Sequence, residues 1–325
     1  MKYVSFFLLL TFTSLSAKNI GITSKKWTGR LGDNIFYVNK CLMLSYKYNL
    51  DFYYRPFDLS DNFVIHTSYP VLTEEIEEKF KKKIVVQHEI HLAHMLKNPA
   101  IDDTLFIVNF DAQTSQHFTT FSKKNHDFKS HIKKLWSPVN VEKLQTLQIP
   151  KNIISVAIHV RKGSFIDGPL ESKSDDPNNP IKTVKHRYQP RYISDRRFPE
   201  KFPPDKFYID AVQLLSETLH HQPLYVYVFT DYAHPQIIVE YYKQRVNLPN
   251  IIWAEREPTA HYKDSVIEDL YNMSQFDCII RPDSYFSRTA ELVGNPKIVL
   301  YPLGHEWKES TLSIKKIGIK KYGEL

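Results

Sequence analysis

Three residues at alternate positions after an apolar run carry the clearest chemical signal in the sequence. His159, Arg161 and Gly163 follow a nearly unbroken run of β-branched residues that begins at Ile153. Alternate side chains of a strand share one face, so His159 and Arg161 are expected to point the same way, and Gly163 would let a ligand approach the backbone. An arginine at the carboxyl end of a buried parallel strand suits a phosphate or diphosphate, because its planar fork matches the phosphate oxygens. An arginine that merely ends a strand in solvent is the competing interpretation, since such short motifs recur by chance.

Further polar residues follow later apolar runs in the same half of the chain. Asp231 ends an expected strand, and Ser284 and Ser287 open an expected helix. The free N–H groups and the dipole of a helix N-terminus attract phosphate, so this turn is a second phosphate-binding device beside Arg161. Asp231, or Asp269 on the preceding expected helix, could accept a hydrogen bond from a ribose or a base. Together these residues suit a nucleoside diphosphate that carries a leaving group.

The segments that position these residues alternate between strand and helix patterns. In the second half we expect strands at 153–158, 224–229, 251–253, 278–280 and 298–301, and helices at 207–220, 236–245, 266–276 and 285–293. In the first half we expect strands at 20–22, 50–54, 63–69, 84–86 and 104–110, a glycine loop at 28–34, and helices at 35–48, 73–83, 126–135 and 141–147. Such alternation predicts α/β domains of the doubly wound type. We therefore predict two Rossmann-like domains, residues 18–150 and 151–325, that face a cleft.

Composition adds a weak indication of an anionic partner. The chain has 325 residues, 42% of them hydrophobic and 24% charged, which is ordinary for a folded protein with two cores. Its net charge of +7 favours a nucleic acid, a membrane surface or a phosphorylated substrate. No nucleic-acid motif accompanies the scattered lysines, so no nucleic-acid partner is expected. Residues 167–204 contain seven prolines and form either a lid or acceptor loop, or a disordered insertion.

The N-terminus resembles an export signal. A lysine, an apolar run and small residues make up residues 1–17, which predicts a cleaved signal peptide and a place in the secretory pathway or outside the cell. That means a Golgi-type lumen in a eukaryote or the cell envelope in a bacterium. An uncleaved membrane anchor is the alternative, and no other segment is long enough to span. Cys41 and Cys278 are expected to be separate buried thiols, because so sparse a pair does not make a disulfide framework.

A histidine cluster in the first half raises the question of a metal. His88, Glu89, His91 and His94 lie close together in sequence. A zincin helix needs H-E-x-x-H, with histidines four residues apart, and here the second histidine comes one residue too early. A structural or surface role is therefore favoured, no metal site is expected, and a secreted metalloenzyme is the weakest of three functional hypotheses.

Five short motifs, in order, resemble those of the α-1,2-fucosyltransferases. The matching segments are GRLGDN at 29–34, HVRKG at 159–163, FTD within 228–231, EDLYNMS at 268–274 and SYFS at 284–287. The family counterparts are G-R-L-G-N-Q, H-V-R-R-G, F-S-D, D-x-x-x-M-S and S-S-F-S. Each motif is weak alone, and the match extends from about residue 29 to residue 302 with an unmatched middle. Two departures are Ser164, where the family usually has aspartate, and Arg288-Thr289, where an aromatic pair often follows.

The resemblance implies a GT-B-like fold and inverting transfer of fucose from GDP-fucose to a sugar hydroxyl of a glycan. It also implies that Arg161 binds the diphosphate and that no metal or cofactor is required, which agrees with the absence of a D-x-D sequence. The expected donor-binding residues are His159, Arg161, Gly163, Asp231, Asp269, Ser284 and Ser287, and the expected acceptor-side residues are Gly29, Arg30, Gly32 and Asn34. The expected catalytic residues are Arg161 and, as a candidate base in a loop facing the cleft, Asp33. A non-catalytic carbohydrate- or nucleotide-sugar-binding protein is the alternative, and it fits the departure at Ser164.

Overall fold

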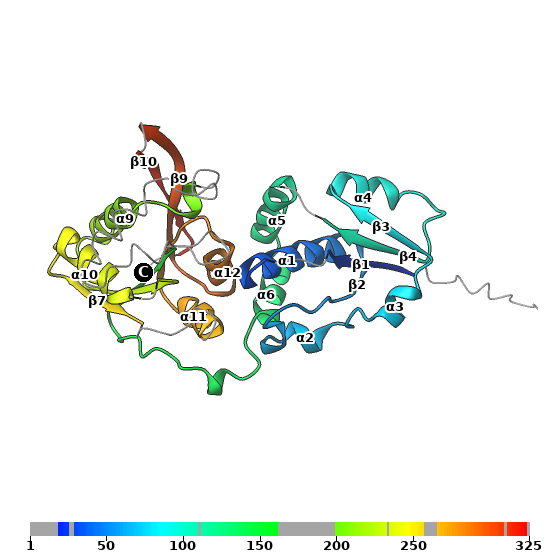
Figure 1. Ribbon diagram of the computed structural model, residues 1–325, viewed down its shortest axis with the longest axis horizontal. Helices are drawn as coiled ribbons and strands as arrows, with labels where there is room; N and C mark the ends of the chain where they lie inside the picture. The colour runs from blue at the N-terminus through cyan, green and yellow to red at the C-terminus, as the bar shows by residue number, and fades with distance from the viewer. Residues whose placement is uncertain are drawn as a thin grey trace, which may run out of the picture.

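The protein is described here by a computed structural model that covers most of the chain. The described residues are 19–25, 29–109, 112–161, 199–232, 234–256, 265–308 and 311–323, with only the backbone described for 112–116. The expected signal peptide, Gly163, Ser164 and most of the proline-rich insertion lie outside these residues. Figure 1 shows two α/β halves, each organised around its own sheet. No helix among the described residues has the length and apolar character needed to cross a membrane.

The first half contains a four-stranded parallel sheet in the order β2-β1-β4-β3. Its strands are β1 (Ile20–Ser24), β2 (Asp51–Phe52), β3 (Lys82–Val86) and β4 (Thr104–Val108). In register, Ile22 of β1 is paired with Phe52 on one side and Phe106 on the other, and all three side chains are buried. The helices around this sheet are α1 (Leu31–Tyr48), α2 (Ile65–Ser68), α3 (Glu74–Glu78), α4 (Glu89–Met95), α5 (Ala112–Lys124) and α6 (His126–Leu135).

Helix α1 begins at Leu31, four residues earlier than the expected helix at 35–48. The side-chain amide of Asn34 donates to the backbone carbonyls of Gly29 (2.7 Å) and Arg30 (3.2 Å), which holds the incoming chain against the first turn. Gly32, Asp33 and Asn34 therefore lie in a helix and not in the loop that the two glycines suggested. The helix ends at Tyr48, and the left-handed backbone of the C-cap residue Asn49 (φ 52°) turns the chain toward β2.

Three other expectations for the first half were wrong. The expected strand at 63–69 is a 3₁₀ turn, η1 (Ser60–Asn62), followed by the short helix α2. Its apolar residues Phe63 and Ile65 are fully buried, and a short buried run does not reveal whether it is helical or extended. The expected helix at 73–83 stops at Glu78, and the one at 141–147 is only the 3₁₀ turn η2 (Val141–Lys143).

The second half contains a six-stranded sheet in the order β10-β9-β8-β5-β6-β7, parallel except for β10. Its strands are β5 (Ile154–Val160), β6 (Leu224–Thr230), β7 (Ile251–Glu255), β8 (Cys278–Ile280), β9 (Ile298–Lys308) and β10 (Thr311–Lys321). Its helices are the 3₁₀ turn η5 (Pro199–Lys201), α9 (Asp205–Thr218), α10 (Pro235–Val246), α11 (Val266–Met273) and α12 (Tyr285–Val293). Because β5 lies between β6 and β8, the carboxyl ends of these three strands adjoin.

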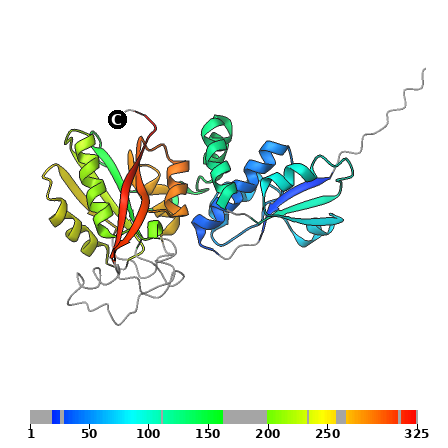
Figure 2. The ribbon, with the colours of Figure 1, turned by 90° about the horizontal axis from the view of Figure 1, so that it is seen from above.

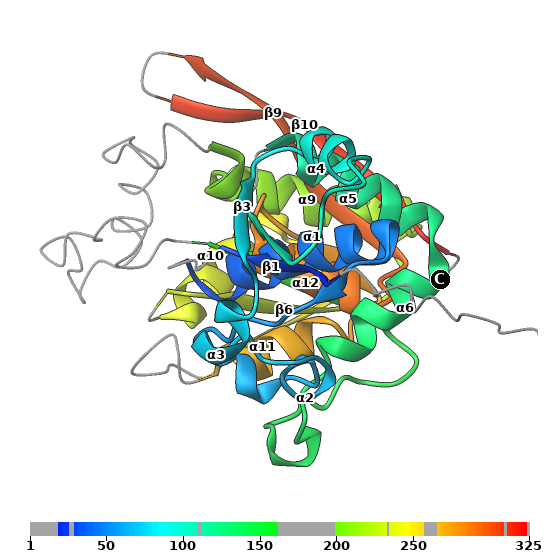
Figure 3. The same cartoon turned by 90° about the vertical axis from the view of Figure 1, so that its right-hand side faces the viewer.

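The last two strands form a long antiparallel hairpin that the sequence did not predict. Only 298–301 was expected as a strand, whereas β9 continues to Lys308 and pairs with β10 from Ile298↔Lys321 to Lys308↔Thr311. Gly318 allows this pairing, because a Cβ there would lie 2.5 Å from the Tyr301 ring. The far end of the hairpin projects from the body of the molecule in Figure 3.

The two halves lie side by side (Figure 2) and are joined by the segment between α6 and β5. Near its start, Val139 donates its backbone N–H to the carbonyl of Asn62 in the first half (2.9 Å). Near its end, the side chain of Asn272 on α11 accepts from the N–H of Leu147 (3.0 Å) and donates to the carbonyl of Gln145 (2.9 Å). Each end of the connecting segment is therefore hydrogen-bonded to a different half.

Candidate active site

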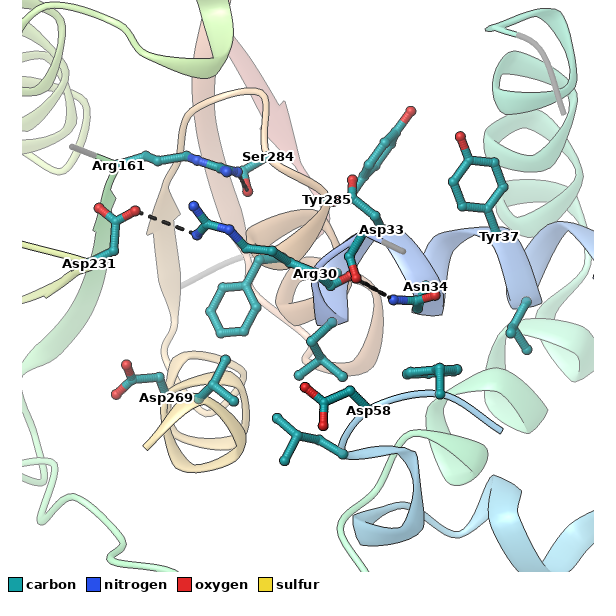
Figure 4. Close-up of a pocket in the computed structure, with 18 of the residues that line it drawn as sticks. Arg30, Asp33, Asn34, Tyr37, Asp58, Arg161, Asp231, Asp269, Ser284 and Tyr285 are labelled. Carbon is teal, nitrogen blue, oxygen red and sulfur yellow. Dashed lines mark hydrogen bonds and ion pairs between the residues drawn. The ribbon is translucent and has the colours of Figure 1, made fainter. Parts of the chain in front are cut away.

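A cavity of about 360 Å³ lies between the two halves, at the carboxyl ends of β5 and β6. Figure 4 shows its walls, with the start of α1 on one side and the ends of the second sheet on the other. Ten of the predicted site residues line it: Gly29, Arg30, Gly32, Asp33, Asn34, His159, Arg161, Asp231, Asp269 and Ser284. Ligands of open α/β sheets bind at such strand ends, and the volume is within the usual range for small-molecule sites.

Arg161 and Ser284 meet at the N-terminus of α12. Arg161 directly follows β5, and its guanidinium donates to the hydroxyl of Ser284 at 3.3 Å. The guanidinium also lies over the ring of Phe202, 5.2 Å from its centroid. Ser284 is the N-cap residue of α12, yet its hydroxyl makes no capping hydrogen bond to the helix. A fixed cation beside the first N–H groups of a helix makes an anion-binding corner on the second-half wall of the cavity.

Ser287 is not brought to this corner. Its side chain is fully buried, and its hydroxyl donates to the backbone carbonyl of Ser284 at 3.3 Å. Ser287 lies in the first turn of α12 and is not among the residues that line the cavity. This geometry makes it a support for the Ser284 turn and gives it no surface on the cavity.

His159 lies beside Arg161 in the cavity wall, as the strand alternation predicted. Burial lowers the pKa of His159 to about 3; Asp231 acts against this shift, and the neighbouring guanidinium of Arg161 adds to it. The imidazole is therefore neutral at pH 7. Its ring lies 5.5 Å from that of Phe286, and Nδ1 has no hydrogen-bond partner among the described residues. A neutral ring with an open nitrogen can accept or donate one hydrogen bond to a ligand.

Arg30 and Asp231 form an ion pair across the cleft. The Arg30 guanidinium, from the residue before α1, lies 3.6 Å from an Asp231 carboxylate oxygen at the end of β6 (Figure 4). Both side chains are mostly buried. One charge comes from each half, so this pair depends on the spacing of the two halves.

Asp269 forms a second ion pair at the cavity wall, with Arg256 at 2.7 Å. Burial raises the pKa of Asp269 to about 7, although the Arg256 guanidinium opposes that shift. The carboxyl group therefore changes its charge near neutral pH, and titration near neutrality is common at functional sites.

Asp33 and Tyr37 face the cavity from the first half. They are four residues apart on α1 and both line the cavity (Figure 4). Burial, the nearby Tyr285 and Asp33 raise the pKa of Tyr37 to about 12, so the phenol remains protonated at neutral pH. Asp33 therefore lines the first-half wall of the cavity and Arg161 lines the second-half wall.

The lining residues that the sequence analysis did not single out include Tyr37, Asp58, Arg256 and Tyr285. Tyr37 could have been found from its helical spacing to Asp33, and Arg256 from its position just after β7. Asp58 lies in an irregular segment that has no periodic pattern, so no local signal marks it. Tyr285 could have been found as the first residue of the expected helix at 285–293.

Gly32 has a packing role at this site. A Cβ on Gly32 would lie 2.4 Å from the backbone nitrogen of Phe286 and 2.7 Å from its Cα. The first turn of α1 therefore rests directly on the start of α12. Beside this contact, the rings of Phe36 and Tyr285 stack with centroids 3.9 Å apart and an interplanar angle of 20°. Gly32 thus helps to join the two halves, and Asn34 shapes the entry to α1. The side chains of Asp33 and Tyr37 line the cavity between the two halves.

The histidine cluster of the first half forms no metal site in the described structure. No group of three or more potential metal ligands gathers in the part of the chain that is described. Glu89 accepts hydrogen bonds from Lys47 (2.5 Å), Tyr48 (3.0 Å) and His117 (3.0 Å). His88 packs edge-to-face on His91 with centroids 5.2 Å apart. These contacts tie α4 to α1 and α5.

No protein-family model and no curated protein matches the chain. Among solved structures, a mutant of FUT1 from Arabidopsis thaliana in complex with GDP has a TM-score of 0.53 and 11% identity, over 90% of this chain and 72% of that one. POFUT1 in complex with GDP-fucose has a TM-score of 0.45 and 12% identity, over 87% and 97% of the two chains. The fucosyltransferase NodZ from Bradyrhizobium has a TM-score of 0.44 and 10% identity, over 95% and 100%. The likeness to FUT1 shows the fold, and the predicted α/β architecture of two Rossmann-like halves facing a cleft, of the GT-B-like kind, is confirmed.

Proposed function

We propose that the chain is a glycosyltransferase that transfers fucose from GDP-fucose, with inversion and without a metal, to a hydroxyl of a glycan. The observation that carries the proposal is the Arg161–Ser284 contact at the N-terminus of α12, inside a cavity between two Rossmann-like halves. A fixed guanidinium and a helix N-terminus are suited to a diphosphate. The solved structure of FUT1, which has a similar fold, is in complex with GDP, and the resemblance of the sequence motifs implies GDP-fucose as the donor.

The donor would lie along the second half. Its diphosphate would lie between Arg161 and the first N–H groups of α12, with the hydroxyl of Ser284 as a further donor. The neutral ring of His159 would contribute one hydrogen bond without adding charge. Asp231 and Asp269, which both line the cavity, would accept from the ribose hydroxyls or the N–H groups of the base.

In the reaction, an acceptor hydroxyl oxygen would form a bond to the anomeric carbon of fucose while the bond from that carbon to the diphosphate oxygen breaks. Negative charge then builds on the departing GDP, and Arg161 would stabilise it there. Positive charge builds on the sugar ring as in other glycosyl transfers. The hydroxyl proton would pass to the carboxylate of Asp33 on the opposite wall of the cavity. The α-1,2 linkage remains a prediction from the motifs.

The alternative is a binding protein that has kept the fold. It is favoured by Ser164, which stands where the resembling family usually has aspartate. GDP release from GDP-fucose separates the two proposals when it is followed with and without a panel of glycan acceptors. Donor binding without any release would support the binding protein.

The decisive test of the donor site is the pair Arg161→Ala and Arg161→Lys. Arg161→Ala should abolish GDP binding measured by calorimetry, and Arg161→Lys should restore it poorly, because lysine lacks the two-pronged donor. Arg245→Ala is the matched control, since Arg245 is exposed on α10 and stacks on Tyr241 away from the cavity. Wild-type GDP affinity in both Arg161 variants would overturn the assignment. Loss of cooperative unfolding in both would show that this arginine serves the fold.

A further inference from the structure

A second cavity, of about 740 Å³, lies on the same seam between the halves. Its walls come from α1, α5 and α6 of the first half and from α12, β9 and β10 of the second. Phe36 lines this second cavity and Tyr285 lines the first, and their rings stack at 3.9 Å. This pair of stacked rings therefore contributes one ring to the wall of each cavity. None of the motifs that point to the donor accounts for the second cavity.

The walls of the second cavity are strongly basic. Six lysine and arginine residues line it against a single carboxylate, that of Glu291. The six are Lys123, Lys129, Arg281, Arg288, Lys297 and Lys320. A concave surface lined by one sign of charge concentrates its field and attracts ions of the opposite sign.

Glu291 balances only one of these six charges, because its partners are two of the lining cations. It accepts from Arg281 at 2.7 Å, from Lys320 at 2.6 Å and from the hydroxyl of Tyr322 at 2.7 Å. Burial acts to raise the pKa of Glu291, but Arg281 and Lys320 lower it to about 2. Even this cluster keeps an excess of one positive charge, since two cations surround one carboxylate. Arg288 pairs separately with Asp283 at the rim.

Three lysines around the cavity have no carboxylate partner among the described residues: Lys123, Lys129 and Lys297. Lys129 on α6 and Lys297 before β9 are half-buried and come from opposite halves. The ammonium of Lys129 lies 5.7 Å from the centroid of the Tyr322 ring. Partial burial of an ammonium without a counter-charge costs free energy, and an anionic ligand would recover that cost.

We propose that the second cavity binds an anionic saccharide, with its sulfate, phosphate or carboxylate groups at Lys123, Lys129 and Lys297. The ring of Tyr322 lines the same cavity, is 47% exposed and provides a flat apolar surface for a sugar ring. In an enzyme of the proposed kind this saccharide belongs to the acceptor, so the acceptor assignment rests on the proposed function. Binding at the second cavity can be measured without any turnover.

The test compares two hexasaccharides binding to the full chain at 150 mM salt. A heparin-derived, sulfated hexasaccharide is the anionic probe, and uncharged chitohexaose is its counterpart. Lys129→Glu and Lys297→Glu should each weaken the sulfated probe by at least tenfold. Lys143→Glu makes the same charge change at an exposed position that does not line the cavity, so it should change affinity by less than about threefold. Lys129→Gln and Lys297→Gln serve if a glutamate variant has a lowered melting temperature.

Three results would overturn the proposal. Lys143→Glu could weaken binding as much as the two cavity variants, which would mean that only the overall charge matters. Chitohexaose could bind as tightly as the sulfated probe, which would mean that charge is not recognised. Inorganic sulfate alone could compete at the affinity of the whole hexasaccharide, which would reduce the cavity to a simple ion site. GDP affinity, measured on the same samples, reports on the proposed donor site separately. A failed test of the second cavity therefore does not contradict the proposed donor site, and the reverse also holds.

Discussion

The contact between Gly32 and α12 decides whether Gly32→Ala raises or lowers the free energy of unfolding. In an isolated helix, Gly32→Ala would stabilise α1 by about 1 kcal/mol, because alanine is the better helix former. Here the new Cβ would lie 2.4 Å from the backbone nitrogen of Phe286 and 2.9 Å from the carbonyl carbon of Tyr285. Ordinary contact begins near 3.4 Å, so the two helices must separate by about 1 Å. Neither obstacle is a side chain that can rotate away.

We expect Gly32→Ala to lower the free energy of unfolding by about 1–3 kcal/mol, the usual cost of overpacking. GDP affinity should stay within about threefold, because Arg161 and Ser284 both belong to the second half. GDP release from GDP-fucose should fall by as much as about 100-fold, since a displacement of 1 Å between the two walls spoils the alignment of reacting groups.

The assay follows thermal unfolding, GDP calorimetry and GDP release on the same preparations. Gly323→Ala is the control, because a Cβ there meets nothing within 4 Å. A Gly32→Ala variant with a raised melting temperature and unchanged GDP release would refute the reasoning, since it would show that α1 and α12 are not in tight contact.

Three further predictions concern the cavity wall. Ser284→Ala should weaken GDP binding about tenfold or more, because a hydrogen bond to a charged acceptor contributes about 1.5–3 kcal/mol. Ser287→Ala should lower only the melting temperature. Equal losses of GDP affinity in calorimetry would contradict the placement of these serines. The folded-state pKa of His159, about 3, is below its unfolded value of 6.5, so its contribution to stability is complete above pH 6.5 and is lost as the pH falls from 6.5 toward 3. Denaturant titrations should therefore show a weaker loss of stability over that range in His159→Gln, and an unchanged pH profile would show that the ring is not buried neutral. Asp231→Asn should weaken GDP binding about tenfold while Arg30→Ala changes it by less than threefold, and the reverse order in calorimetry would place the donor in the first half.

The residues at the strand ends were predictable from the sequence, because residues that follow neighbouring parallel strands lie close together. Arg161 and Asp231 follow strands that lie side by side in the sheet, and Ser284 follows the strand on the other side of β5. Periodicity and β-branched runs identified those strands, and the carboxyl ends of parallel strands meet at one edge. The second-half wall of the cavity could therefore be predicted without any knowledge of long-range packing.

The seam between the halves was not predictable, because it depends on contacts between residues that are distant in sequence. The sequence places Gly32 in a glycine loop on the acceptor side, and the backbone of Tyr285 and Phe286 explains why glycine is needed there. Ser287 shares the motif of Ser284 but lies a turn further along, so its direction depended on where α12 begins. Strand β10 of the terminal hairpin is rich in exposed lysines, as loops often are. Its sequence therefore does not reveal a strand, and only its pairing with β9 does.

The hydrogen bonds of the connecting segment determine where the molecule can flex. Val139 is bonded to Asn62 of the first half, while Gln145 and Leu147 are bonded to Asn272 of the second. Each end of the segment must therefore move with its own half, and rotation of one half relative to the other falls on residues 140–144, which hold only the turn η2. Residues 140–144 are therefore the expected hinge between the halves. The backbone amide of Leu147 should exchange with solvent slowly, and fast exchange there would show that the hinge extends into the second half.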